Sequence, residues 1–275
     1  GYIQCSAPKG LTGNKIKLPR VSVGATENIV MAASLASGET EISNIALEPE
    51  VIDLINCLNT MGAKIELGDN RSVVIQGVKT LNGSNYSIIP DRIEAITYII
   101  AGALAGDGLK IENLNIEHIS NVLETLKKLP VDIIFDENSV TVNKSNISEG
   151  IEIQTEEYPG FPTDVQAQMM VLMSMAKTKS VIDENIFENR FMHVPELNRM
   201  GANIEINGKK AIINPCSGFR GAPVMATDLR ASVSLILAGL AAEGETTLNR
   251  IYHLDRGYEQ IEVKLEACGA EIKRV

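Results

Sequence analysis

The sequence lacks any apolar run long enough to cross a bilayer. The longest, residues 165–176, is short and interrupted, so we expect no transmembrane segment. Basic residues are also in deficit, because 25 Lys and Arg against 35 Asp and Glu leave a net charge of −10. Nucleic-acid surfaces need clustered Lys and Arg, so this balance argues against one. Tryptophan is absent, but 44% hydrophobic residues and this length are ample for two cores.

Cysteine is sparse and shows no pairing pattern. Cys5, Cys57, Cys216 and Cys268 have neither CxxC nor Cys/His metal spacing, which predicts no disulfide, no structural metal and a reducing compartment. We interpret all four as buried small hydrophobes. The opening GYIQCSAPKG has neither an initiator Met nor a signal-peptide n-region and reads like the middle of a strand. We therefore expect the chain to be a fragment.

One pattern of about 70 residues occurs four times and accounts for the whole chain. The second half of each copy predicts a helix followed by a strand: LINCLNTMGAKIEL (54–67), VLETLKKLPVDIIF (122–135), VPELNRMGANIEI (194–206) and IEVKLEACGAEIKRV (261–275). Three copies place Gly-Ala where the helix must end and the strand begin, because glycine tolerates the left-handed conformation that ends a helix. The second copy uses Leu129-Pro130.

The first half of each copy predicts a helix that is apolar almost all round, near 24–36, 91–105, 164–177 and 228–242. Such helices are buried on every side, which predicts an α/β domain with helices inside sheet walls. If symmetry points these helices the same way, their N-termini form an anion site suited to a phosphorylated ligand. Alternatively, Asp91, Asp164 and Asp228 are simply N-caps.

Seven motifs resemble the UDP-N-acetylglucosamine enolpyruvyl transferase family. They span almost the whole chain in the family's order and spacing: SVGATENI (22–29), EPEVID (48–53), PDRIEA (90–95), FPTDVQAQ (161–168), ENRFMHVPEL (188–197), MATDLRAS (225–232) and YHLDRGYEQI (252–261). The resemblance implies transfer of the enolpyruvyl group of phosphoenolpyruvate to the sugar 3-hydroxyl with release of phosphate. This is the first committed step of bacterial peptidoglycan synthesis, carried out in the cytoplasm without metal or organic cofactor.

The resemblance also implies two inside-out α/β domains of three repeats each, with four of the six repeats present here. Residues 1–89 would be the last repeat of the first domain, and residues 90–275 the three repeats of the second. The absent N-terminal part would carry a Lys-Asn pair and a loop with a reactive Cys, so the chain alone is expected to be inactive. That missing fragment is a candidate partner.

Site residues follow from the motif matches. Arg20, Val21, Ser22, Val23 and Gly24 match the segment that holds the nucleotide phosphates, with Arg20 alternatively an ordinary surface residue. Asp164 matches the carboxylate at the sugar 3-hydroxyl and is the expected general base, which requires a pKa that can be raised. Ile186 and Phe187 match sugar-nucleotide contacts, with Phe187 alternatively part of the core.

Asp228 and Arg230 match a second acid/base carboxylate and a cleft arginine. Arg256 matches the arginine that clamps phosphoenolpyruvate, whose carboxylate and phosphate suit a planar guanidinium. Arg190 and Arg92 are weaker candidates that could instead pair with carboxylates. His118, His193 and His253 match no catalytic position, so structural hydrogen bonds are expected of them.

Two alternatives stay open. The shikimate-pathway enolpyruvyl transferase shares the fold and the donor, although ENRFMHVPEL and FPTDVQAQ argue against it. A non-catalytic nucleotide-sugar binding remnant is the other, and the acidic and basic residues at Asp164, Asp228, Arg230 and Arg256 argue against that.

Overall fold

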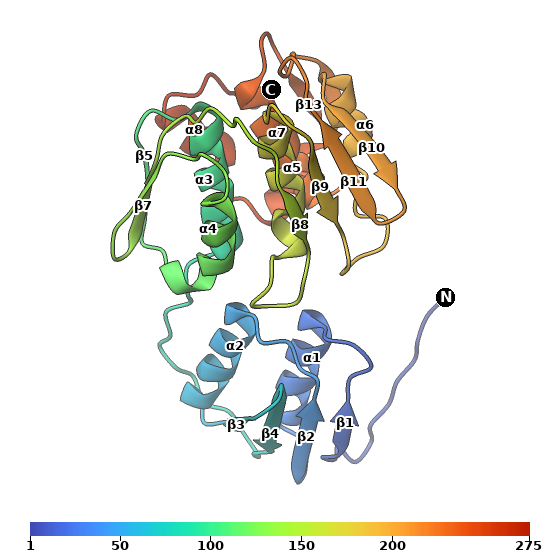
Figure 1. Ribbon diagram of the computed structural model, residues 1–275. Helices are drawn as coiled ribbons and strands as arrows, with labels where there is room; N and C mark the ends of the chain where they lie inside the picture. The colour runs from blue at the N-terminus through green and yellow to red at the C-terminus, as the bar shows by residue number, and fades with distance from the viewer. The chain divides into compact units, whose positions relative to one another are not determined.

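The computed structural model describes residues 1–275 and divides into two compact units (Figure 1). Unit 1 contains residues 1–89 with 157–159, and unit 2 contains residues 90–156 with 160–275. None of its helices has the length and apolarity that a membrane crossing requires.

Unit 1 packs two helices on one four-stranded sheet. The strand order is β1 (Lys15–Lys17), β2 (Glu39–Ser43), β4 (Ser72–Gln76), β3 (Lys64–Gly68), with β1 parallel to β2 and the other pairs antiparallel. The helices are α1 (Val23–Ala33) and α2 (Pro49–Thr60). Fully buried Val30, Ile42 and Ile75 connect α1 to the sheet and form the core of the unit.

The same sheet topology returns in unit 2. β8 (Glu152–Gln154) runs parallel to β9 (Ser180–Asp183), which pairs antiparallel with β11 (Lys210–Asn214), and β11 with β10 (Asn203–Asn207). A second sheet, β5 (Leu109–Glu112), β7 (Ser139–Val142) and β6 (Ile133–Phe135), is entirely antiparallel. A third consists of the parallel pair β12 (Pro223–Met225) and β13 (Thr247–Asn249). The recurring order confirms the predicted repeats.

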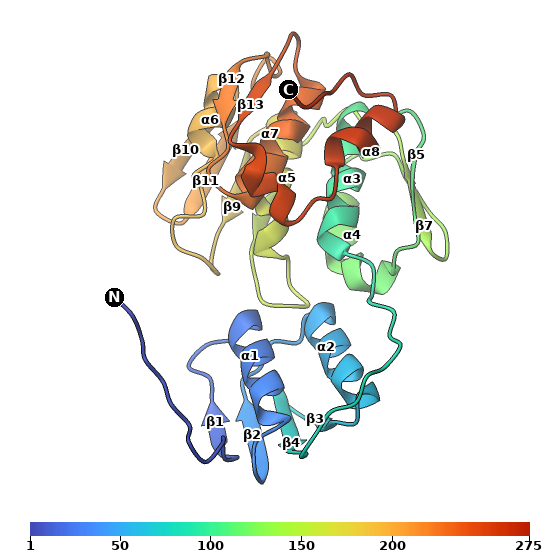
Figure 2. The same ribbon diagram turned by 180° about the vertical axis from the view of Figure 1, so that it is seen from behind.

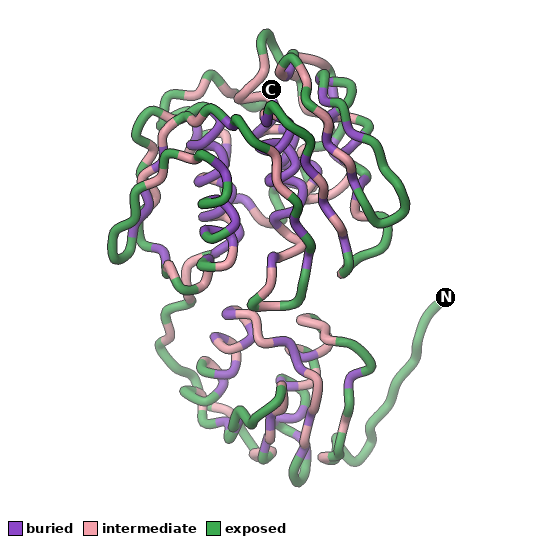
Figure 3. Tube along the Cα trace, viewed as in Figure 1, coloured by how far each residue is buried: buried purple, intermediate pink, exposed green.

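Three helices form the centre of unit 2: α3 (Arg92–Ala105), α5 (Gln166–Ser174) and α7 (Leu229–Ala241). Each packs against the other two and against strands of its own repeat, and the sheets lie outside them (Figures 1 and 2). All nine residues of α5 are buried, and burial stabilises the fold by roughly 1.5–3 kcal/mol per large apolar side chain. Figure 3 colours α3 and α5 mainly as buried. This inside-out α/β arrangement confirms the predicted fold class.

Shorter helices complete unit 2. They are α4 (Ser120–Leu126), α6 (Val194–Arg199), α8 (Ile261–Ala267) and the 3-10 helices η1 (Ile116–Ile119), η2 (Thr163–Val165) and η3 (Ile251–Arg256). The three predicted Gly-Ala helix ends are confirmed, since Gly62, Gly201 and Gly269 have φ of 99°, 101° and 97°. The strand predicted after α8 is absent from residues 271–275, where the structure contains no partner strand to pair with.

Three other expectations are wrong. Helix α1 is buried on one side only, and Met31 is exposed, as is Leu35 just beyond the helix, because no second apolar helix of unit 1 covers its other face. Residues 1–6 form no strand, since none pairs with them. The four cysteines are free thiols, but Cys5 and Cys268 are exposed and the other two only half-buried, so the interpretation as buried hydrophobes fails.

A buried threonine joins α1 to the chain that follows β2, and we predict how much its hydrogen bonds contribute to stability. The Thr26 hydroxyl donates to the Ser22 carbonyl at 2.8 Å and accepts from the Ala46 amide at 3.0 Å, with Thr26 and Ala46 both fully buried. Thr26→Val keeps the shape but leaves that amide unpaired, which should cost about 1–3 kcal/mol.

Hydrogen exchange of the unit 1 amides during urea titration measures this cost. Thr60→Val is the matched control, because its exposed hydroxyl donates to the Cys57 carbonyl at a helix end. Equal destabilisation by the two variants would contradict the prediction.

Candidate active site

The predicted base Asp164 lies between two arginines in unit 2. Its Oδ1 accepts hydrogen bonds from Nη2 of Arg190 at 2.7 Å and from Nε of Arg230 at 3.1 Å. Arg190 comes from the loop after β9, and Arg230 is the second residue of α7. The fold thus assembles three sequence-predicted residues from two neighbouring repeats into one acid–arginine centre, defined here as Asp164, Arg190 and Arg230.

The pKa of Asp164 is set by opposing effects. Burial raises the pKa of this carboxyl, but Arg230, Arg190 and Arg92 lower it, and the net pKa lies below its ordinary value. The guanidinium charges therefore outweigh desolvation, and the pKa of Asp164 could be raised only if these arginines were engaged elsewhere. A carboxylate held this way is ionised at neutral pH and is a weak base until its arginines are drawn elsewhere.

The N-termini of α3, α5 and α7 lie around this centre. Their hydrogen bonds show which of the three aspartates, Asp91, Asp164 and Asp228, are N-caps. Oδ1 of Asp91 accepts from the amides of Ile93 and Glu94, and Oδ1 of Asp228 from those of Arg230 and Ala231, at 2.8 and 3.0 Å in each case. Both are N-caps, as the alternative held. Asp164 caps no helix, because η2 and α5 begin without a side-chain cap. Its carboxylate is left to the arginines.

The Asp228 carboxylate has one oxygen less fully engaged. Oδ1 takes both helix amides, whereas Oδ2 accepts only from the Thr227 hydroxyl at 3.4 Å. The cap therefore orients Asp228 and leaves Oδ2 able to accept a further donor.

Arg256 lies exposed at the end of η3, beside the start of α7. A Cβ on Gly257 would come within 2.8 Å of Leu229 Cδ2, so the chain next to Arg256 packs tightly on the first residue of α7. No carboxylate pairs with Arg256, so its guanidinium remains available to a ligand.

Glu184, which sequence reasoning missed, organises the loop that carries Arg190. This carboxylate is 3% exposed and accepts four hydrogen bonds, from the hydroxyls of Thr155 and Thr163 and the amides of Ile186 and Phe187, at 2.9 to 3.1 Å. Thr163 directly precedes Asp164. Glu184 therefore connects the segment of Asp164 to the loop of Arg190, and only its position between a strand and a polar loop could have indicated this in the sequence.

The other predicted ligand contacts of unit 2 lie in this loop. Ile186 is half-buried, and both predicted residues give their amides to Glu184 rather than leaving them open. Phe187 is 52% exposed with the Arg190 guanidinium 5.1 Å from its ring centroid, so its interpretation as core is wrong. A cation over an aromatic face restrains both side chains.

The predicted phosphate segment, Arg20 to Gly24, leads into α1 of unit 1. The Ser22 hydroxyl caps α1 by accepting from the Ala25 amide at 3.3 Å. Arg20 and Gly24 are exposed, and Val21, Ser22 and Val23 are half-buried. Nearby, burial and the charges of Glu50 and Glu48 raise the pKa of Glu27, a carboxyl that sequence reasoning did not single out.

His193 is buried behind the centre, and its Nε2 has no hydrogen-bond partner. The structural hydrogen bond expected of it is not found at this atom, whereas His118 does contact Asn115, at 3.2 Å. Burial lowers the pKa of His193 to about 4; Asp228 acts in the opposite direction, and Arg190 lowers it further.

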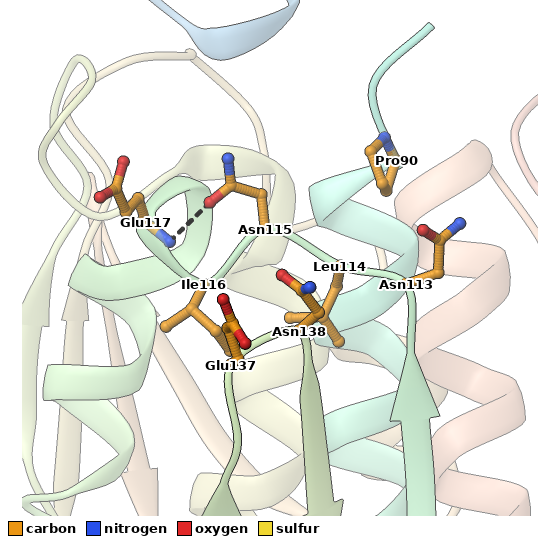
Figure 4. A pocket seen from close by; sticks show the side chains of 8 residues that line it. All are labelled: Pro90, Asn113, Leu114, Asn115, Ile116, Glu117, Glu137 and Asn138. Carbon is orange, nitrogen blue, oxygen red and sulfur yellow. Dashed lines mark hydrogen bonds between the residues drawn. The ribbon is translucent and has the colours of Figure 1, made fainter. Parts of the chain in front are cut away.

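A pocket of about 520 Å³ opens elsewhere in unit 2, around η1. Its lining includes none of the predicted site residues and is mainly amide and carboxylate groups (Figure 4): Pro90, Asn113, Leu114, Asn115, Ile116, Glu117, Glu137 and Asn138. An open polar hollow without a basic group does not suit an anionic donor. We therefore keep the acid–arginine centre as the candidate site.

Comparison with known proteins agrees with the fold. The chain superposes on the crystal structure of the enolpyruvyl transferase NikO from Streptomyces tendae with a TM-score of 0.84 and 29% identity, over 91% of this chain and 60% of that one. An EPSP synthase from Acinetobacter baumannii shares the fold at a TM-score of 0.74 and 18% identity, over 96% of this chain and 64% of that one. The fold is that of the enolpyruvyl transferases.

Sequence comparison then identifies the family. The family model for EPSP synthase (3-phosphoshikimate 1-carboxyvinyltransferase) matches residues 2–265, and the chain belongs to that family. The chain is similar over its full length to curated proteins named UDP-N-acetylglucosamine 1-carboxyvinyltransferase: 54% identical to that of Gluconobacter oxydans and 55% to that of Pelagibacter ubique. It spans 66% of the length of each.

We predict that His193 makes stability depend on pH. Because its folded pKa is about 4 against 6.5 unfolded, the unfolded chain binds one more proton between these values. Stability from this group is present above pH 6.5 and is lost as the pH falls towards 4, by about 3 kcal/mol.

Urea unfolding at pH 7 and pH 4.5 tests this prediction. His193→Gln should lose about that much of the pH dependence, whereas His253→Gln, a half-buried control, should keep it. The same pH dependence in both variants would show that His193 does not titrate as described.

Proposed function

We propose that this chain belongs to a protein that transfers the enolpyruvyl group of phosphoenolpyruvate to the 3-hydroxyl of UDP-N-acetylglucosamine and releases phosphate. The observation that carries the proposal is Asp164 held by Arg190 and Arg230 at the start of the central helices. Such a site offers a base to an alcohol and positive charge to an anion in the same place.

The arginines give Asp164 two states. Without ligand, Arg230 and Arg190 lower its pKa and suppress its basicity. A phosphate or carboxylate that engages these guanidinium groups competes with Asp164 for them, so the pKa of Asp164 rises as the donor binds. Binding of the donor thereby prepares the base.

The reaction then balances as an addition and an elimination. Asp164 takes the proton of the sugar 3-hydroxyl while the oxygen of that hydroxyl forms a bond to C2 of phosphoenolpyruvate. The methylene carbon of phosphoenolpyruvate receives a proton in the same step. Loss of that proton equivalent from the methyl group and cleavage of the C–O bond to phosphate restore the enol ether. The open Oδ2 of Asp228 is a second acid/base candidate for the methylene.

Arg256 completes the donor site in this proposal. It is exposed and unpaired beside α7, and a guanidinium binds a carboxylate or phosphate through two parallel hydrogen bonds. Arg20 to Gly24 of unit 1 would hold the nucleotide phosphates, with the capped N-terminus of α1 supplying amides and partial positive charge. Ile186 and Phe187 would contact the sugar nucleotide.

The acceptor is the point at which the alternatives differ. Identity of 54–55% to proteins named for UDP-N-acetylglucosamine, against 18% to an EPSP synthase structure, favours the nucleotide sugar over a shikimate acceptor. A non-catalytic remnant is disfavoured by the paired Asp164 and Arg230 and the unpaired Arg256.

The remaining expectations stay proposals. Residues 1–89 would be the last repeat of one domain and residues 90–275 the three repeats of a second. The full-length relatives contain a segment, about one third of their length, that this chain does not match. Activity would need that segment, as part of the same chain or as a bound fragment. The protein would act in the cytoplasm, where both substrates are available.

We predict that Asp164→Asn removes turnover while sparing acceptor binding. Removing a positioned general base should lower phosphate release by about 10²–10⁴-fold, with the UDP-N-acetylglucosamine Kd changed by less than about threefold. The assay joins this chain to the unmatched third of the Gluconobacter oxydans relative and follows phosphate released from phosphoenolpyruvate. Exposed Asp107→Asn is the control, and near-normal release by Asp164→Asn would remove Asp164 as base.

We predict that Arg256→Ala raises the KM for phosphoenolpyruvate. Loss of a charge-assisted contact to the donor corresponds to a rise of about 10- to 100-fold, with little change in the KM for the nucleotide sugar. Arg256→Lys should fall between, since it keeps the charge but not the planar fork. An unchanged donor KM in the alanine variant would place the donor site elsewhere.

A further inference from the structure

Glu184 is a buried carboxylate that the proposed reaction does not use. It directly follows β9 and is 3% exposed. Its four hydrogen-bond donors are all neutral, two threonine hydroxyls and two backbone amides. A carboxylate is costly to bury unless such donors satisfy it, so the donors must keep close to this geometry for the charge to remain in the core.

The two oxygens of Glu184 hold different parts of the site. Oε1 accepts from the amides of Ile186 and Phe187 at 3.0 and 3.1 Å, and from the Thr155 hydroxyl at 2.9 Å. Oε2 accepts from the Thr163 hydroxyl at 3.0 Å. The loop after β9 is therefore fixed through Oε1, and the start of η2 is fixed through Oε2.

These contacts close a circuit through the acid–arginine centre. Thr163 directly precedes Asp164, whose Oδ1 accepts from Nη2 of Arg190 at 2.7 Å. The Arg190 guanidinium lies 5.1 Å from the centroid of the Phe187 ring, and the Phe187 amide donates to Glu184. A shift of Asp164 relative to Arg190 therefore strains at least one link of the circuit.

We propose that Glu184 is a positioning residue for the enolpyruvyl transfer, whose two carboxylate oxygens set Asp164 opposite Arg190. Because it is buried with both oxygens engaged, it acts through Thr163 and the loop amides and does not touch the substrates. The proposal rests on the proposed function for its effect on turnover. Its effect on the pairing of Asp164 with Arg190 is independent of that function.

Two pairs of variants separate the contacts of the two oxygens. Thr163→Val removes the donor to Oε2 and leaves the charge of Glu184 in place, whereas Thr163→Ser keeps that donor as the conservative variant. Glu184→Gln removes the charge from both oxygens. Asp183→Asn is its matched control, because it makes the same change at the preceding residue, whose carboxylate pairs with Lys209 and Lys210.

The first measurement uses this 275-residue chain and needs no activity. The pKa of the Asp164 carboxyl is followed by carbon-13 nuclear magnetic resonance during a pH titration, with Asp164→Asn to identify the signal. Because Arg230 and Arg190 lower this pKa, looser pairing should raise it. We expect the pKa to rise in Thr163→Val and to equal that of the parent in Thr163→Ser.

Glu184→Gln distinguishes positioning from the removal of a charge. Loss of a nearby negative charge alone would lower the pKa of Asp164, whereas loss of its positioning would raise it. We expect a rise in Glu184→Gln and no rise in Asp183→Asn. A pKa that stays unchanged or falls in Thr163→Val, or that falls in Glu184→Gln, would overturn the proposal.

The second measurement uses the extended protein of the phosphate-release assay. Thr163→Val should lower kcat by about tenfold with the KM for the nucleotide sugar unchanged, because the loop amides stay bound to Oε1. Glu184→Gln should lower kcat and also raise that KM by about three- to tenfold, because it loosens the loop that carries Ile186 and Phe187. Thr163→Ser and Asp183→Asn should match the parent.

The outcomes of the two measurements are separable. A loss of folded protein alone would lower kcat and leave both KM values unchanged in every variant, so the absence of the expected split would contradict the role in turnover. Normal kcat in Thr163→Val would contradict it as well. An inactive parent would instead contradict the proposed function, and the titration would still decide whether Glu184 positions Asp164.

Discussion

Helices that are apolar on every side must be covered on every side, and this constraint organises unit 2. A single sheet buries only one face of such a helix, so α3, α5 and α7 bury their remaining faces against one another and leave their sheets outside. Packing in this way brings the starts of the three helices together. Unit 1 shows the opposite case, because Met31 of its one apolar helix, α1, stays exposed where no equivalent helix of that unit covers it.

The starts of the three helices bring unpaired backbone amides and aspartate carboxylates close together, and the three aspartates find different partners there. Asp91 and Asp228 satisfy helix amides, whereas Asp164 has no cap to make and takes the arginines instead. One aspartate therefore differs chemically from two others at similar places in the repeat. Its basicity depends on whether Arg190 and Arg230 are engaged by another anion, which links donor binding to base strength in the function we propose.

Rigid support extends outward from this carboxylate in two directions. Glu184 gathers four donors and holds the loop of Arg190. On the core side, Gln168 donates to the Asp164 carbonyl and to the Thr97 hydroxyl, which lies 2.8 Å from the hydroxyl of Tyr258. Both supports use buried, directional hydrogen bonds, which have a narrow range of good geometries. The segment of Asp164 and the loop of Arg190 are thus held by the buried side chains of Gln168 and Glu184.

Periodicity in the sequence determined the repeats, the apolar helices of unit 2 and the glycine ends of α2, α6 and α8 at Gly62, Gly201 and Gly269. These features depend on neighbours in the chain, and together they indicated the fold class. Motif resemblance also named the aspartates and arginines. Only the tertiary structure decided that two arginines pair with Asp164 and lower its pKa, and that Glu184 supports the loop of Arg190. The contacts of Asp164 with its arginines and of Glu184 with Thr163 join residues 21 to 66 positions apart, which no local pattern records.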